Sequence, residues 1–148
     1  MKFVMDTNVL IAGMRSPTGA AAEILRLVLL GRMELLASVA LFVEYEAVAT
    51  RNEHLSAAGL TTNDVLMLLD ALAGKIRLVN IHFNWRPQLK DPDDEMVLEL
   101  AVNGSADAII TFNARHFGIA PRAFGICVLT PADALKHWQT HFPETEGS

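Results

Sequence analysis

A chain of 148 residues is long enough for one domain with a substantial core. Its composition, 51% apolar and 20% charged, excludes a disordered chain. The formal net charge of −5 disfavours binding of nucleic acid through basic patches alone, because a polyanion needs cations where it is held. The single cysteine, Cys127, excludes an internal disulfide and is typical of a reducing compartment; its apolar neighbours predict a buried side chain.

The first part of the chain carries no targeting or membrane-spanning pattern. Asp6 interrupts the first apolar run before a signal peptide could form. The most apolar stretch, residues 20–30, contains Glu23 and Arg26 and is shorter than a helix that spans a bilayer. We therefore expect a cytoplasmic protein without a membrane segment.

Strand-like apolar runs alternate with segments of helical period. The predicted strands are residues 2–5, 34–38, 76–81, 108–111 and 126–129. The predicted helices are residues 20–30, 39–50, 62–73, 93–103 and 132–141. Alternation of this kind predicts an α/β fold with a central parallel sheet of about five strands between helices, in a three-layer α/β/α sandwich.

Helix-capping residues support these boundaries. Asp91-Pro92 and Thr130-Pro131 each offer a capping side chain followed by proline at the first helical position. With no linker in sight, we expect one domain over residues 1–142, a loop at residues 82–90 and a disordered tail at residues 143–148.

Asp6 follows directly on the first predicted strand and is succeeded by Thr7 and Asn8. In parallel α/β sheets the ligand crevice lies beyond the carboxyl ends of the strands, which is where this carboxylate is expected. The alternative is that Asp6 only caps a turn by accepting hydrogen bonds from nearby backbone amides.

Glu44 borders the apolar stripe of the second predicted helix. Helical geometry places it about 60° from Leu41, whereas Glu46 lies about 140° away and faces water. A carboxylate beside an apolar stripe is costly unless its charge is compensated. A basic partner, or a side chain that reaches past the helix edge, would explain it equally well.

Asp94 repeats this pattern in the helix that starts after Asp91, because Val97, Leu98 and Ala101 share its face. The alternative is again local, since acids are favoured in the first turn of any helix. Asp91 and Asp93 are assigned to that local role.

Asp6, Glu44 and Asp94 all fall on the carboxyl-end side of the sheet if each crossover is right-handed. Two carboxylates about 4 Å apart repel by about 4 kcal/mol at an effective dielectric of 20. Protonation or a divalent cation relieves that repulsion, and a site made of hard oxygen ligands suits Mg²⁺ or Mn²⁺. The sequence therefore predicts an acidic metal site that serves phosphodiester chemistry.

The ordered set of motifs around these acids covers nearly the whole chain, from Phe3 to about Ala134. It consists of the runs at residues 4–10, 38–45, 91–101, 106–113 and 130–131. With these motifs the chain resembles PIN-domain proteins, and most closely the VapC-like ribonuclease toxins of prokaryotic toxin–antitoxin systems.

The resemblance implies that Asp6, Glu44 and Asp94 are the metal ligands, with Thr7, Asn8 and Thr111 supporting them. A fourth catalytic position, usually an acid in the family, falls on Asn113. This departure removes one charge from the site and leaves open whether one or two metal ions bind.

The expected function is a Mg²⁺- or Mn²⁺-dependent endonuclease that acts on single-stranded RNA. Arg15, Arg51, Lys90 and Arg115 are candidate phosphate contacts. The resemblance further implies a homodimer and a cognate antitoxin protein that blocks the site. Four apolar residues could contribute to such surfaces, but we expect each of them to lie in the core: Met33, Phe42, Met67 and Trp85.

Two alternatives remain. A phosphatase of the haloacid-dehalogenase type would use Asp6 as a nucleophile, but it requires a second Asp where Asn8 stands. A non-catalytic module that keeps the fold and binds nucleic acid or a partner is favoured by Asn113.

Overall fold

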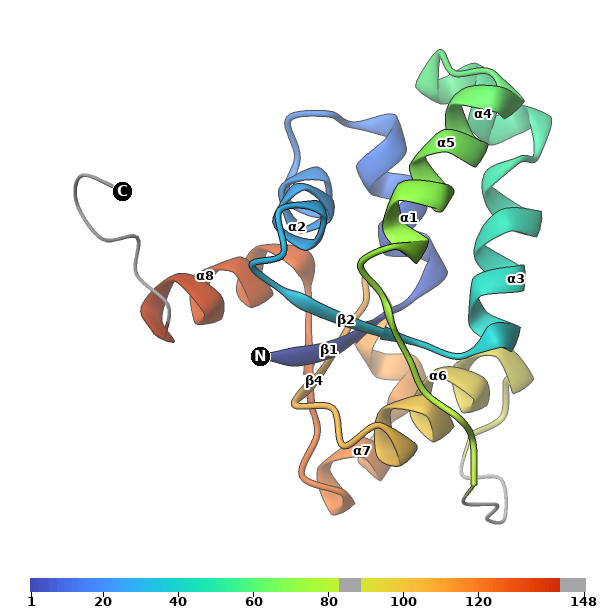
Figure 1. The fold of residues 1–148 in the computed structure, drawn as a ribbon. Helices are drawn as coiled ribbons and strands as arrows, with labels where there is room; N and C mark the ends of the chain where they lie inside the picture. The colour runs from blue at the N-terminus through green and yellow to red at the C-terminus, as the bar shows by residue number, and fades with distance from the viewer. Residues whose placement is uncertain (83–88, 142–148) are drawn as a thin grey trace.

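The computed structural model describes residues 1–82 and 89–141. Within them the strands form one all-parallel sheet in the order β3-β2-β1-β4-β5 (Figure 1). The strands are β1 (Lys2–Met5), β2 (Glu34–Ala37), β3 (Arg77–Leu78), β4 (Ala108–Ile110) and β5 (Cys127–Leu129). The predicted α/β architecture around a parallel sheet of five strands is confirmed.

Helices cover both faces of this sheet. Helix α6 packs on β1 and β4 from one face, while α1 and α2 contact each other and lie on the other face (Figure 1). The helices are α1 (Thr7–Arg15), α2 (Ala20–Leu29), α3 (Val39–Ala49), α4 (Asn52–Ala58), α5 (Thr62–Ala73), α6 (Pro92–Asn103), α7 (Ala120–Ala123) and α8 (Pro131–His141), with the 3-10 helix η1 (Ala114–Phe117). None of these helices, within the described ranges, has both the length and the apolar character to traverse a bilayer.

The order of the strands determines where a crevice can form. From β1 the chain builds β2 and β3 on one side, and β4 and β5 lie on the other. The direction in which successive strands are added therefore reverses between β1 and β4. Ligands of parallel α/β sheets bind at the carboxyl ends of the strands that flank such a point. Asp6 follows β1 and Thr111 follows β4, so both lie at this point.

Three caps start helices close to this edge. Asp6 caps α1. Ser38 caps α3, where its hydroxyl accepts a hydrogen bond from the Leu41 amide at 3.1 Å. Asp91 caps α6, where its carboxylate accepts a hydrogen bond from the Asp93 amide at 2.8 Å. Pro92 occupies the first turn of α6, as the sequence predicts. Tyr45 of α3 is fully buried, and its hydroxyl donates to the Met5 carbonyl at the end of β1. The cap and this bond hold α3 against the strand that precedes Asp6.

The sequence patterns missed several elements. Helix α1 has no counterpart among the predicted helices; it is only nine residues long, and six of them are buried. Helices α4, η1 and α7 are short and were also missed. The strand predicted at 76–81 reduces to Arg77–Leu78, which are both exposed. Part of the predicted loop, residues 83–88, and the whole predicted tail lie outside the described residues.

Two burial predictions are wrong. Cys127 is exposed, because β5 is an edge strand and this residue lines an open cleft beside Arg122. Met67 is 72% exposed, because it lies on the outer face of α5, whose buried residues are Val65, Leu69 and Leu72. Met33 is buried and Phe42 half-buried, while Trp85 lies outside the described residues.

Candidate functional site

Asp6 lies between the ends of β1 and β4 and is held by groups from both. Its Oδ1 accepts a hydrogen bond from the Thr7 amide at 2.8 Å, and its Oδ2 accepts one from the Thr111 hydroxyl at 2.8 Å. The side-chain amide of Asn8 lies 3.5 Å from the same Oδ2. Burial raises the pKa of Asp6 above its ordinary value, although these hydrogen bonds oppose the shift. The local capping alternative is therefore also realised, since Asp6 caps α1 while it faces the site.

Glu44 projects from α3 toward the start of α1. The hydroxyl of Thr7 donates a hydrogen bond to Glu44 Oε2. Burial raises the pKa of Glu44, and the neighbouring carboxylates of Asp93 and Asp6 raise it further. Glu44 is half-buried, whereas Glu46 is exposed, as the helical angle predicts. No basic partner within the described residues pairs with Glu44, so that alternative is not realised there.

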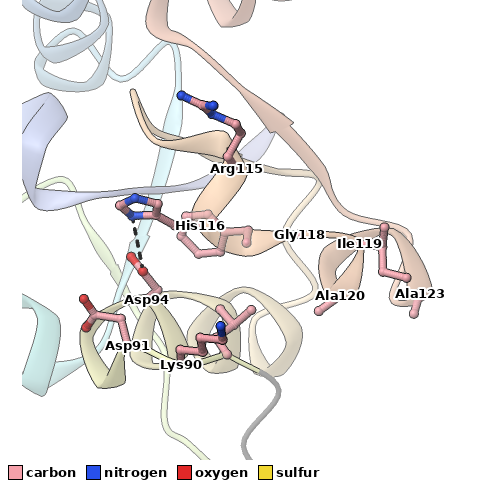
Figure 2. A pocket seen from close by; sticks show the side chains of 11 residues that line it. Lys90, Asp91, Asp94, Arg115, His116, Gly118, Ile119, Ala120 and Ala123 are labelled. Carbon is pink, nitrogen blue, oxygen red and sulfur yellow. Dashed lines mark ion pairs between the residues drawn. The ribbon is translucent and has the colours of Figure 1, made fainter.

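Asp94 enters the site from the first turn of α6 and is only 8% exposed. Its Oδ2 lies 3.6 Å from Nδ1 of His116 in η1 (Figure 2). Burial raises the pKa of Asp94, and the charges of Asp91 and Asp6 add to the shift, while His116 lowers it. A carboxylate in the first helical turn would ordinarily be stabilised, so burial and crowding outweigh the helix dipole here.

These acids share one electrostatic region. The charge of Asp6 raises the pKa of both Glu44 and Asp94, and Asp93 acts on all three. Nevertheless, the described part of the chain contains no group of three His, Cys, Asp or Glu side chains placed closely enough to hold one ion. The structure thus brings the predicted ligands to one edge without assembling them in a shared coordination shell.

The donor set nevertheless fits Mg²⁺ or Mn²⁺ in its chemistry. All three side chains offer hard carboxylate oxygens, and burial together with the charge of Asp93 raises the pKa of each. A divalent cation would compensate the negative charges that burial and repulsion destabilise.

The predicted supporting residues connect the strand ends. Thr111 is fully buried; its hydroxyl donates to Asp6 and accepts from the Asn113 amide at 3.0 Å. Asn8 accepts from the amide of Phe112 at 3.4 Å, which ties the loop after β4 to α1. Asn113 itself is exposed in that loop, immediately before η1.

Sequence reasoning missed three residues at this edge. Asp93 is an ordinary acid of a first helical turn by its sequence, yet its charge raises the pKa of Glu44. His116 had no recognisable spacing, and only the turn of η1 brings it to Asp94. The position of Tyr45, four residues after Leu41, is typical of the buried face of a helix, but its hydrogen bond to Met5 has no signal in the sequence.

An open cleft of about 720 Å³ adjoins Asp94. Lys90 and Arg115, two of the four candidate phosphate contacts, line it, whereas Arg15 and Arg51 do not. Asp107 lies at the opposite edge of the sheet, where its carboxylate accepts a hydrogen bond from the Lys2 amide at 2.9 Å. Asp107 therefore has a structural role, because it ties the start of β4 to the start of β1.

Comparisons with known proteins agree with this geometry. A family model described as PIN domain matches residues 2–115. Among solved structures, the chain is similar to the crystal structure of VapBC2 from Rickettsia felis bound to a DNA fragment from their promoter. The match has a TM-score of 0.58 and 11% sequence identity, and it covers 87% of this chain and 98% of that chain. A search of curated proteins found no match. Because the family model spans most of the sequence, the chain belongs to the PIN-domain family.

Proposed function

We propose that this chain is a Mg²⁺- or Mn²⁺-dependent endoribonuclease that cleaves single-stranded RNA. PIN domains are generally nucleases. The observation that carries the proposal is the gathering of Asp6, Glu44 and Asp94 beside the β1–β4 crevice, each with a raised pKa. Acids that are destabilised in one place are typical of a functional site rather than of a structural ion-pair network.

Asp6, Glu44 and Asp94 would hold the ion, and Asn113 offers one neutral oxygen at the rim. When bound, the ion would neutralise charge on the scissile phosphate and lower the pKa of a water molecule. Thr111 and Thr7 keep the carboxylates of Asp6 and Glu44 oriented through their hydroxyl groups. Such outer hydrogen bonds are usual around metal ligands and are costly to remove.

In the proposed hydrolysis, a water molecule gives up one proton, and its oxygen forms a bond to phosphorus in line with the leaving group. The bond between phosphorus and the 3′ oxygen breaks, and the 3′ oxygen takes up a proton. The carboxyl edge of the sheet suits this reaction because it is open on the side of the cleft beside Asp94.

We further propose that the chain acts in the cytoplasm as the toxin of a toxin–antitoxin pair and forms a homodimer. The similarity in fold to the VapBC2 structure supports the pairing with an antitoxin. Exposed apolar side chains on two contacting helices support a dimer surface: Val39 and Val43 of α3 and Met67 of α5. Isolated exposed apolar residues are common, but a group on adjoining helices is typical of an interface.

A non-catalytic RNA-binding module is the second candidate. It is favoured by Asn113 in place of an acid and by the absence, among the described residues, of three ligands within reach of one ion. An Asp-nucleophile phosphatase is less well supported, since Asn8 stands where the second Asp is required.

Cleavage of a mixed RNA pool by the purified protein tests the proposal. We expect cutting in Mn²⁺, none in chelator, and none by Asp6→Asn in Mn²⁺. Cutting that persists unchanged in Asp6→Asn would reject the assigned site. Binding of the pool by the wild type without any cutting would favour the non-catalytic module, and a trappable acyl-phosphate on Asp6 would favour the phosphatase.

A further inference from the structure

The cleft beside Asp94 has two chemically different ends (Figure 2). Asp91, Asp94 and His116 lie at one end, which is continuous with the proposed active site. Ile119, Ala120 and Ala123 lie at the other end and form an apolar wall. A volume of about 720 Å³ is within the range of clefts that take small organic ligands.

Two basic side chains line the cleft on opposite sides: Lys90 lies beside Asp91 and Asp94, and Arg115 lies above His116 (Figure 2). Lys90 comes from the segment that leads into α6, and Arg115 comes from η1 on the opposite wall. Both are exposed, and neither forms an ion pair with an acid among residues 1–82 and 89–141. In a chain with a net charge of −5, two uncommitted cations beside an acidic site are suited to hold a phosphate.

The apolar wall is accessible to a ligand. Ile119 is 83% exposed and Ala123 is exposed as well, so both can contact a group that enters the cleft. A nucleotide base has a flat apolar face that can lie against such a wall. The phosphates beside it carry the negative charge that can pair with Lys90 and Arg115.

We propose that this cleft binds one unpaired nucleotide of the substrate RNA, next to the phosphate that is cut. The base lies against Ile119, Ala120 and Ala123, and the phosphates on the two sides of that nucleotide contact Lys90 and Arg115. The inference rests on the proposed function, since it takes the scissile phosphate to lie at Asp6, Glu44 and Asp94. It assigns to the cleft the preference for single strands and for the nucleotide beside the cut.

Two substitutions test the apolar wall, and both positions are exposed enough to tolerate change. Ile119→Ser removes apolar contact, and Ala123→Trp fills the cleft. Binding of a fluorescein-labelled single-stranded RNA is measured by anisotropy in chelator, so that no cutting occurs. We expect each variant to weaken binding at least about fivefold, because the apolar contact between the base and the wall is lost or blocked. Leu30→Ser, an exposed apolar position at the end of α2 outside both the cleft and the proposed dimer surface, is the control and should leave binding unchanged.

The basic residues are tested through salt dependence. Lys90→Gln and Arg115→Gln should each reduce the slope of log affinity against log salt by about 0.7, as expected for one lost contact to a single-strand phosphate. Lys75→Gln is the control, because Lys75 is exposed before β3, at the amino-end edge of the sheet.

Sequencing of the cut ends from an RNA pool in Mn²⁺ separates this inference from the proposed function. We expect Ile119→Ser and Ala123→Trp to change the nucleotide preferred beside the cut. Unchanged binding and an unchanged cut pattern would overturn the inference while the enzyme still cuts. If no protein cuts RNA but the cleft variants still bind it more weakly, the nuclease proposal fails and the cleft assignment stands. Weaker capture of the cognate antitoxin with unchanged RNA binding would instead assign the cleft to a protein segment and overturn the inference.

Discussion

Two groups of acids in this protein stand in opposite electrostatic situations. At the start of α5, Asp64 forms a capping box with Thr61: its carboxylate accepts from the Thr61 amide at 2.9 Å, and its own amide donates to the Thr61 hydroxyl at 3.1 Å. These hydrogen bonds lower the pKa of Asp64. At the carboxyl edge of the sheet, Asp6 also accepts hydrogen bonds, yet burial raises its pKa.

The contrast separates an acid that serves the fold from acids that serve a site. Asp64 is fully exposed and lies among backbone amides, so its charge is favourable where it is. Asp6 is desolvated, and its charge raises the free-energy cost of the charges on both Glu44 and Asp94. Such an arrangement persists only because the surrounding structure holds it, and a cation would relieve it.

The largest expected effect compares two acids on one helix. Glu44→Gln should reduce RNA cleavage in Mn²⁺ by at least about a hundredfold, because it removes a charge from the proposed metal site. Glu46→Gln should leave cleavage within about twofold, since Glu46 is exposed on the other side of α3. Initial rates on one RNA measure both. Equal loss in the two variants would show that α3 is sensitive as a whole and that Glu44 has no special role.

Mn²⁺ should stabilise the folded protein through Asp6 and its neighbouring acids, and the stabilisation should not depend on Asp64. Mn²⁺ at a hundredfold excess over its Kd would add about 2.7 kcal/mol to the stability of the folded state. That raises the Tm of a domain of this size by about 5 to 11 °C. The rise should disappear in Asp6→Asn and persist in Asp64→Asn. A rise that survives in Asp6→Asn would place the ion elsewhere.

The frame of the site can be weakened without any change of charge. Tyr45→Phe leaves the Met5 carbonyl without its buried donor, which should cost about 1 to 3 kcal/mol of unfolding free energy. Urea unfolding measures the loss. Phe42→Leu, a half-buried change on the same helix, is the control and should cost less than about 1.5 kcal/mol. A stability of Tyr45→Phe equal to the wild type would show that the hydroxyl is not needed to hold α3 against β1.

The smallest effect concerns the pH dependence of stability, which should have opposite signs for Asp6→Asn and Asp64→Asn. It is measured as the Tm of each variant relative to wild type, in chelator. Asp6 has a raised folded-state pKa, so its charge costs stability increasingly as the pH rises from its ordinary value of 3.8 through the folded-state pKa. Asp64 has a lowered pKa, so its contribution is present above 3.8 and is lost as the pH falls through the folded-state pKa. From about pH 3 to pH 7, the Tm of Asp6→Asn relative to wild type should therefore rise, and that of Asp64→Asn should fall.

The same sign for both variants would contradict this contrast between the two acids. Asp70→Asn, an exposed position on the outer face of α5, controls for the general effect of removing one negative charge.

Much of the fold was readable from local patterns, and the failures have identifiable causes. Buried parallel strands read as short continuous apolar runs, so β1, β2, β4 and β5 were found within a residue or two. Proline after a capping residue located the start of α6. Helix α1 was missed because it is short and most of its residues are buried. The predicted strand at residues 76–81 is longer than β3, because an apolar run does not show how far strand pairing continues.

The site was readable only in part. The angle between Glu44 and Leu41 correctly separated Glu44 from Glu46, since helical geometry is local. Asp93 and His116 have no such signal, because Asp93 looks like an ordinary acid in a first turn and His116 reaches Asp94 through the path of η1. The roles of Asp6, Glu44, Asp94 and Asn113 in metal binding remain predictions for the experiments above.

The sequence by itself determined the alternation of strands and helices, the caps that start the helices, and the candidate acids at strand ends and helix edges. These depend on neighbours within about one helical turn, where spacing and side-chain chemistry are sufficient. Only the tertiary structure decided which acids share one field, that His116 faces Asp94, and that an apolar wall continues from the acids into a cleft. Those facts depend on how distant segments pack against one another, because burial and proximity, rather than residue type, set the energy of a charge.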